Sequence, residues 1–235
     1  MSTVPSELCY ACDQIATSRE HAPSRCLFPP LKDCGGVDSR RDLITVWACD
    51  AHNQSKSADD EYLWYTLAMN VASGAFGREV FLKRVMRAIE RKPALAQRMF
   101  ADFVPLILVH EETGQAQGSV GVIADWRRLE ASFALIARAI YYHHFGERNL
   151  LPAKVICEFQ LQIDGPAPRA ANELMRDMVL GLDQLFGGRE MHGANQRVFQ
   201  YQVFAEQDLH RTAIRLHFYE GARVTVLLDA LPAAE

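Results

Sequence analysis

Two pairs of thiol and imidazole side chains near the start of the chain have the spacing of metal ligands. Cys9 and Cys12 form a Cys-x-x-Cys pair, and Cys49 and His52 repeat the same separation with histidine in the last position. A knuckle turn places two ligands on one side of a metal, so two such pairs supply the four tetrahedral positions of structural zinc. The sequence therefore predicts a structural zinc site at Cys9, Cys12, Cys49 and His52.

The remaining cysteines fit packing better than metal binding. Cys26 and Cys34 lie between the two pairs, but their separation does not match a knuckle, and an apolar Leu-Phe dipeptide follows Cys26. Cys157 lies in an apolar stretch typical of a strand, where a thiol behaves as a small hydrophobic side chain. Six cysteines in 235 residues are also too sparse for a disulfide scaffold. We interpret these three residues as core or unligated thiols.

The segment that carries the zinc ligands needs a metal to hold it together. Proline and glycine interrupt it repeatedly, and residues 43–47 form its one convincing strand. About 50 residues with so little regular structure cannot bury enough apolar area to fold alone. Small units of this kind depend on a metal or on disulfides, and the ligand pairs point to the metal.

An acid–histidine dipeptide lies between the two ligand pairs. Glu20 and His21 are followed by Ala22-Pro23, Asn53 directly follows the last zinc ligand, and Lys56 comes three residues later. In this order, together with the two ligand pairs, these pieces resemble the HNH endonuclease family in its Cys-x-x-Cys form. The resemblance covers the first quarter of the chain, and the ordered combination is its most specific element.

The resemblance implies a ββα-metal active site that hydrolyses phosphodiester bonds, with DNA as the substrate and partner before RNA. It implies that His21 is the general base, a role that an imidazole with a pKa near 6.5 can fill at neutral pH. It also implies that Glu20 and Asn53 hold a catalytic divalent ion, and their oxygen ligands suit Mg²⁺ or Mn²⁺. The family further suggests a role in defence against foreign DNA or in the biology of mobile elements.

Two positions depart from the family pattern. The middle asparagine, which orients the catalytic histidine, is absent, and Thr45 stands in that part of the chain. Asn53 stands where many members have histidine, and an amide is the weaker ligand. A second hypothesis follows, in which the module has lost catalysis and serves as a zinc-binding element for nucleic acid or for a protein partner.

A basic stripe is predicted on a helix further along the chain. Between residues 78 and 98, seven basic side chains stand against two acidic ones, although the net charge of the whole chain is −4. Helical spacing places Lys83, Arg84, Arg87 and Arg91 on one face, opposite the apolar face. This stripe is either a surface that contacts DNA phosphates or a solvated helix face, and the sequence leaves both readings open.

The elements that must position these residues form an α+β fold. We predict a zinc-stapled ββα-metal (HNH-like) module over residues 1–57, a helical segment over 58–103, and an α+β domain over 104–235 for recognition, dimerisation or regulation. Apolar periodicity and turn residues predict the elements of the last two units. They are helices over 59–72, 78–91, 93–103, 125–145 and 169–186, and strands over 104–110, 118–124, 155–163, 197–205, 212–219 and 223–228.

Composition and the pattern of apolar residues indicate the cellular compartment in which we expect the protein. A hydrophobic fraction of 49% and a charged fraction of 23% are ordinary for a globular protein. The first eight residues lack the pattern of a signal peptide, and no apolar run is long enough to span a membrane. We therefore expect a cytoplasmic protein without membrane contact. A third hypothesis assigns the C-terminal sheet to a homodimer, a regulatory partner or a small ligand.

Overall fold

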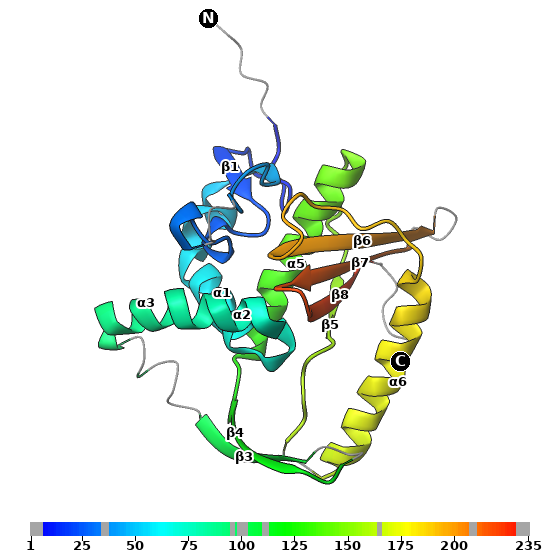
Figure 1. Cartoon of the computed structure of the whole chain (residues 1–235). Helices are drawn as coiled ribbons and strands as arrows, with labels where there is room; N and C mark the ends of the chain where they lie inside the picture. The colour runs from blue at the N-terminus through cyan, green and yellow to red at the C-terminus, as the bar shows by residue number, and fades with distance from the viewer. Residues whose placement is uncertain are drawn as a thin grey trace, which may run out of the picture.

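The chain folds as a mixed α+β structure, as predicted (Figure 1). A computed structural model describes residues 7–33, 38–94, 97, 103–109, 113–163, 166–206 and 211–228. Within these ranges the strands form two two-stranded sheets and one four-stranded sheet, and every pairing is antiparallel. No described helix is long and apolar enough to cross a membrane.

The N-terminal module has ββα topology. Strand β1 (Ser18–His21) pairs with β2 (Thr45–Ala48), and helix α1 (Ser57–Met69) follows after two short 3-10 turns, Asp50–His52 and Gln54–Lys56. The side chains of a strand alternate between its two faces. Glu20, Val46 and Ala48 are accordingly buried, whereas Arg19 on the opposite face is exposed. The predicted strand over 43–47 is confirmed, displaced by one to two residues.

Three helical segments follow α1 without a full break. Helix α2 (Gly74–Val80), a π-helical turn (Phe81–Val85) and α3 (Met86–Arg91) form one continuous run. A short 3-10 turn, Val71–Ser73, links this run to α1. The predicted helix over 78–91 is therefore confirmed with an earlier start. Most of the predicted helix over 93–103 lies outside the described residues.

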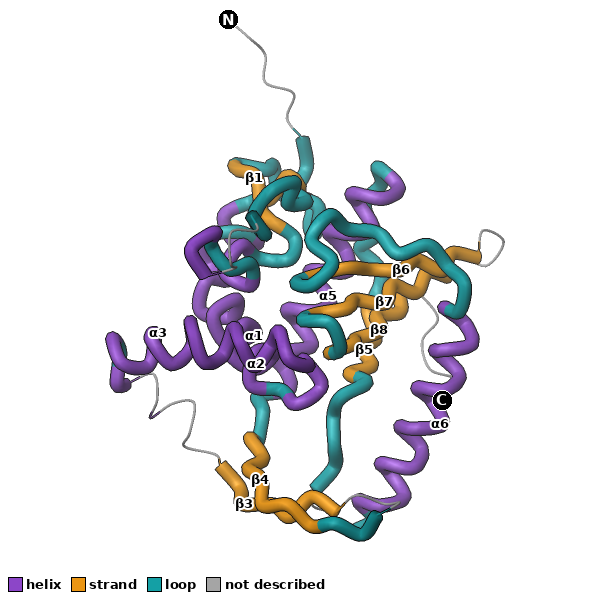
Figure 2. The backbone as a smooth tube through the Cα atoms, in the orientation of Figure 1, coloured by secondary structure: helices purple, strands orange, loops and turns teal. Residues whose placement is uncertain are grey.

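A hairpin stands apart from the main sheet. Strands β3 (Phe103–Val109) and β4 (Ala116–Val122) pair only with each other among the described strands, and Figure 2 shows them away from the four-stranded sheet. Both predicted strands are confirmed. Several of their apolar side chains are exposed: Ile107, Val109, Val120 and Val122.

The main sheet has the strand order β5-β8-β7-β6 and lies between two helices. Helix α5 packs on one face, where the Phe133 ring lies 5.9 Å from the Phe218 ring, and helix α6 packs on the other, where Phe186 shares a buried cluster with Ala213. The bounds are β5 (Ala153–Cys157), β6 (Phe199–Glu206), β7 (Arg211–Phe218), β8 (Ala222–Leu228), α5 (Trp126–Phe145) and α6 (Pro168–Phe186).

Local signals account for the ends of these elements. The Asp125 side chain accepts a hydrogen bond from the backbone N–H of Arg128 at 3.4 Å and caps α5. Gly146, at φ 74°, ends α5 in the left-handed conformation that suits glycine. The predicted strand over 155–163 is wrong in length. It ends at Cys157 because the chain turns there, with the N–H of Gln160 donating to the Cys157 carbonyl at 3.1 Å.

The N-terminal module shares its hydrophobic core with the rest of the chain. Tyr10, Val46 and Cys49 pack against Ala139 of α5. The hydroxyl of Tyr219, between β7 and β8, also donates to the Leu27 carbonyl at 2.7 Å. The boundary near residue 57 stays a prediction, but core contacts cross it, so the stability of the module depends on α5.

A buried charged network joins the main sheet to α6. Arg215 and Glu158 have side chains only 3% and 2% exposed, and the guanidinium binds both carboxylate oxygens. Asp183 of α6 accepts from Arg215 at 2.7 Å and from Arg223 at 2.8 Å. Buried charges are tolerated when they are paired in this way. We interpret the network as a structural link that fixes α6 on the sheet.

His217 extends this polar layer in its neutral form. The Gln202 amide nitrogen donates to the carbonyls of Phe186 and Arg189, at 3.1 and 3.0 Å. Its oxygen must therefore accept, and the His217 Nε2–H, 3.2 Å away, must donate. Burial and the neighbouring Arg215 and Arg223 charges lower the pKa of His217 to about 4. The imidazole is consequently uncharged at neutral pH.

This low pKa predicts an acid-sensitive fold. The unfolded chain protonates His217 near pH 6.5 and the folded chain only near pH 4, so the stabilisation is complete above pH 6.5 and is lost as the pH falls between these values. A His217→Gln chain keeps a neutral donor and should lose less stability over that window. Urea unfolding of both chains at pH 7 and pH 5 measures the difference, and parallel losses would contradict the assignment.

Candidate metal centre and neighbouring cavity

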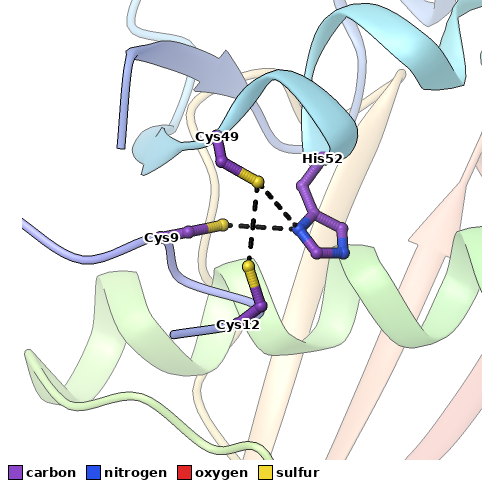
Figure 3. Close-up of side chains that lie close together, drawn as sticks. All are labelled: Cys9, Cys12, Cys49 and His52. Atoms are coloured by element: carbon purple, nitrogen blue, oxygen red, sulfur yellow. Dashed lines mark hydrogen bonds between the residues drawn. The ribbon is translucent and has the colours of Figure 1, made fainter. Parts of the chain in front are cut away.

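The four predicted zinc ligands converge on one point (Figure 3). Their ligand atoms all lie within 4.8 Å of one another, and no other group of three or more such side chains is found in the described ranges. The Cys12 and Cys49 sulfurs are 3.7 Å apart, and His52 Nδ1 lies 3.5 Å from Cys9 Sγ and 3.3 Å from Cys49 Sγ. Tetrahedral zinc with ordinary bond lengths requires about 3.8 Å between sulfurs and about 3.5 Å between sulfur and nitrogen.

Short local turns hold the ligands in place. Cys9 is anchored by its N–H to the Gln14 carbonyl at 2.8 Å, and its sulfur accepts from the N–H of Ala11 at 3.5 Å. Cys49 directly follows β2 and stands at the N-cap of the 3-10 turn, where the His52 N–H donates to the Cys49 carbonyl at 3.1 Å. The first pair therefore comes from a knuckle, and the second from the junction between strand and helix.

The protonation states of the cluster suit a metal. Although burial raises it, the pKa of the Cys49 thiol is lowered overall by hydrogen bonds from the His52 backbone and from neighbouring thiols. Burial raises the pKa of Cys12 to about 11 without a metal. Burial, Arg138 and Lys56 lower the pKa of His52, so its imidazole is neutral and free to bind through Nδ1. A bound cation would deprotonate the thiols. The residues fit Zn²⁺.

The Cys/His cluster is also tied to α5 and to the loop beyond it. Ala139 of α5 packs in the same core as Cys9 and Cys49. Arg148 donates to the Cys12 carbonyl at 2.9 Å and to Asp13 at 3.1 Å. Contacts behind the ligands of this kind hold a metal site in one geometry.

The other cysteines do not join the cluster. The Cys26 thiol donates to the Asp60 carbonyl at 3.4 Å, and burial raises its pKa to about 11. Cys157 is buried in β5, and burial raises its pKa to about 12. Both therefore remain protonated packing side chains, as predicted. Cys34 lies outside the described residues.

No protein-family model, curated protein or solved structure matches this chain.

His21 lies at the end of β1, beside a small cavity of about 40 Å³. Burial and the positive charge of Arg25 lower the pKa of His21 below its usual value, so the imidazole is neutral at pH 7. Glu20, Lys56 and Asp60 line the same cavity. The predicted general base thus borders the same cavity as two carboxylates and an ammonium group.

Lys56 links the two carboxylates of the cavity. Its Nζ lies 2.6 Å from Glu20 Oε1, and 2.7 and 2.9 Å from the two Asp60 oxygens. Burial raises the pKa of Glu20, and Lys56 opposes that rise. Burial in turn lowers the pKa of Lys56, but the two carboxylates outweigh it and raise that pKa overall. The ammonium group is therefore charged and fully engaged by acids.

Asn53 faces a different neighbour. Its amide nitrogen donates to Ser18 Oγ at 2.7 Å and to the Arg19 carbonyl at 3.3 Å. These bonds join the two 3-10 turns on either side of Asn53 to β1. The carbonyl acceptor fixes which end of the amide points to the strand. An amide nitrogen does not bind a hard cation. Because Glu20 meets Lys56 and Asn53 turns its nitrogen to β1, these residues do not fit a shared Mg²⁺ or Mn²⁺.

Thr45 is also engaged elsewhere. It pairs across the hairpin with His21, but its hydroxyl accepts from Arg19 at 2.8 Å. The Arg19 guanidinium lies over the Trp47 ring, 4.8 Å from its centroid. The outer face of the β1–β2 pair therefore carries an arginine stacked on a tryptophan. The sequence did not indicate a role for either residue.

The predicted basic stripe is divided between surface and interior. The prediction that Arg84 lies on the exposed stripe is wrong. Its side chain is only 12% exposed, lies over Trp64 and donates to the Cys26 carbonyl at 3.0 Å. It turns inward because loop residues 26–33 cover that side of the helix, a contact that helical periodicity cannot reveal. Lys83 pairs with Glu79, and Arg87 pairs with Asp33. Arg91 is exposed at the end of α3.

Proposed function

We propose that this chain is a nuclease that hydrolyses phosphodiester bonds with His21 as the general base. The observation that carries the proposal is the ββα module, in which a neutral histidine ends β1 beside a cavity, in the same module as a Cys/His cluster that fits zinc. This combination supports the likeness to HNH endonucleases that the sequence motifs suggest. The zinc would hold the module together and take no part in the reaction.

The proposed chemistry uses groups of the chain itself. His21 takes a proton from a water molecule as the water oxygen bonds to phosphorus, because its lowered pKa keeps it unprotonated at neutral pH. The scissile P–O bond on the opposite side breaks, and the departing oxygen takes a proton from solvent. The attack builds negative charge on the phosphate oxygens, which nearby cations stabilise. Arg25 is exposed and close enough for its charge to act on His21, so it can contact the phosphate.

DNA is the proposed substrate. The exposed members of the basic stripe, Lys83 and Arg91, and the half-exposed Arg87 offer contacts to the phosphate backbone. Arg19 over Trp47 adds a cation and an aromatic face on the outside of the hairpin, and both are used by proteins that bind single strands. The outer face of the β1–β2 pair and the basic stripe are therefore the proposed DNA-contacting surfaces.

Cleavage of plasmid DNA tests the proposal. The zinc-loaded chain is incubated with supercoiled plasmid, with Mg²⁺, with Mn²⁺ and without either, beside a His21→Ala chain purified in the same way. We expect nicking by the wild-type chain and little by the variant. No nicking by the wild-type chain under any of these conditions would reject the proposed function.

A second candidate function is a zinc-stapled module that binds nucleic acid or a protein partner without cleaving. The specific observation in its favour is that Asn53 and Thr45 are used to join parts of the module. Under this candidate, the plasmid would shift on a gel but stay supercoiled. A homodimer or a regulatory partner would use the exposed apolar side chains of the β3–β4 hairpin.

A further inference from the structure

The buried contact between Lys56, Glu20 and Asp60 has the form of a filled cation site. The three side chains come from β1, the turn before α1 and the first turn of α1. The side chain of Lys56 is only 13% exposed, that of Glu20 8% and that of Asp60 17%. Three carboxylate oxygens surround one Nζ at 2.6 to 2.9 Å, which uses all three N–H donors of the ammonium group.

The charges explain why a cation must sit there. Glu20 and Asp60 are both acidic, and two carboxylates that share a buried site repel each other strongly. The Lys56 ammonium cancels one charge and donates hydrogen bonds to both groups. Asp59, which also lines the cavity, is held by Arg128 at 2.7 Å, so its charge is already matched. Nothing in this arrangement leaves two carboxylates free for a second cation.

We infer that Lys56 is the resident cation of this site, occupying the position that a divalent metal would otherwise take between Glu20 and Asp60. This inference rests on the proposed function for its catalytic consequence only. If the chain is a nuclease, hydrolysis at His21 needs no Mg²⁺ or Mn²⁺, in contrast to what the family resemblance implies. Whether or not it cleaves DNA, the wild-type site should refuse a divalent ion.

An ordinary structural ion pair predicts something different. Such a pair would hold β1 against α1, and removing Lys56 would lower stability in the same way with or without divalent ions. A filled cation site predicts instead that removing the ammonium leaves two facing carboxylates, which hard cations bind through oxygen. The gain of a metal site on loss of a lysine therefore distinguishes the two.

Manganese binding provides the test. Zinc-loaded wild-type, Lys56→Ala and Lys56→Arg chains are prepared in buffer freed of divalent ions, and free Mn²⁺ is measured by its electron paramagnetic resonance signal. We expect the wild-type and Lys56→Arg chains to leave Mn²⁺ free and Lys56→Ala to bind it. Added Mn²⁺ should also raise the melting temperature of Lys56→Ala alone, because binding to the folded state stabilises it.

The outcomes separate this inference from the proposed function. Mn²⁺ bound by the wild-type chain and lost in a Glu20→Gln chain would overturn the inference, even if the plasmid is cleaved. Failure of Lys56→Ala to bind Mn²⁺ while folded would also overturn it. If that variant does not fold, Lys56→Gln, which removes the charge but keeps a hydrogen-bond donor, takes its place in the same measurement. Plasmid cleavage without divalent ions supports the catalytic consequence, whereas cleavage only with Mg²⁺ or Mn²⁺ contradicts it.

Discussion

A Cys9→Ser chain should fail to hold zinc and should lose its N-terminal module. Structural zinc sites supply an apparent free energy of about 10–16 kcal/mol, as much as the whole stability of an ordinary domain. Cys9 is fully buried in the core that joins the cluster to Ala139 of α5. We therefore expect the damage to spread to α5 and to lower the melting temperature of the whole chain.

A matched cysteine provides the control. Cys26→Ser makes the same chemical change in the same segment, but its thiol is bound to the Asp60 carbonyl and lies outside the cluster. Zinc content per chain and thermal unfolding, with and without a chelator, measure both variants. Far less than one zinc per wild-type chain, together with normal folding of Cys9→Ser, would contradict the zinc site.

Replacing His21 by alanine should lower kcat/KM for phosphodiester cleavage by about 10²–10⁴-fold, the usual contribution of a general base. The fold should change little, because His21 lies at the end of β1 and is only half-buried. Since burial and Arg25 lower its pKa, the wild-type activity should stay high as the pH falls to 6.5 and should drop only below that. The variant should show no such step.

His143→Ala is a suitable control for this measurement. His143 is also a histidine whose pKa is lowered by burial, but it ends α5, away from the cavity beside His21. Its removal should leave both the rate and the pH profile unchanged. Equal cleavage by His21→Ala and the wild-type chain, at every pH, would remove His21 from the proposed mechanism.

The sequence alone was sufficient to predict those features whose decisive signal lies within a few neighbouring residues. The ligands Cys9, Cys12, Cys49 and His52 could be predicted because each pair carries its own spacing, and a metal explains why two pairs meet. The ends of α5 could be predicted because Asp125 and Gly146 act within one turn of the helix. The α+β class followed from periodicity, which is also a property of neighbouring residues.

The features that the sequence did not reveal depend on contacts between distant segments. Lys56 stood out only as part of a motif, because its partner Glu20 lies on another element. Arg84 was placed on an exposed stripe, because the loop that covers it approaches from residues 26–33. Packing of α5 against the zinc cluster was likewise hidden, since no local pattern in residues 126–145 distinguishes that contact from ordinary core.

The sharing of a core between the zinc cluster and α5 has a consequence for synthesis of the chain. All four ligands precede residue 53, whereas α5 is complete only at Phe145. At ordinary translation rates the ligands leave the ribosome about 5–20 s before the helix that covers them. We therefore expect that, if the four ligands bind zinc, the metal has time to bind before α5 is complete and can pack on the cluster.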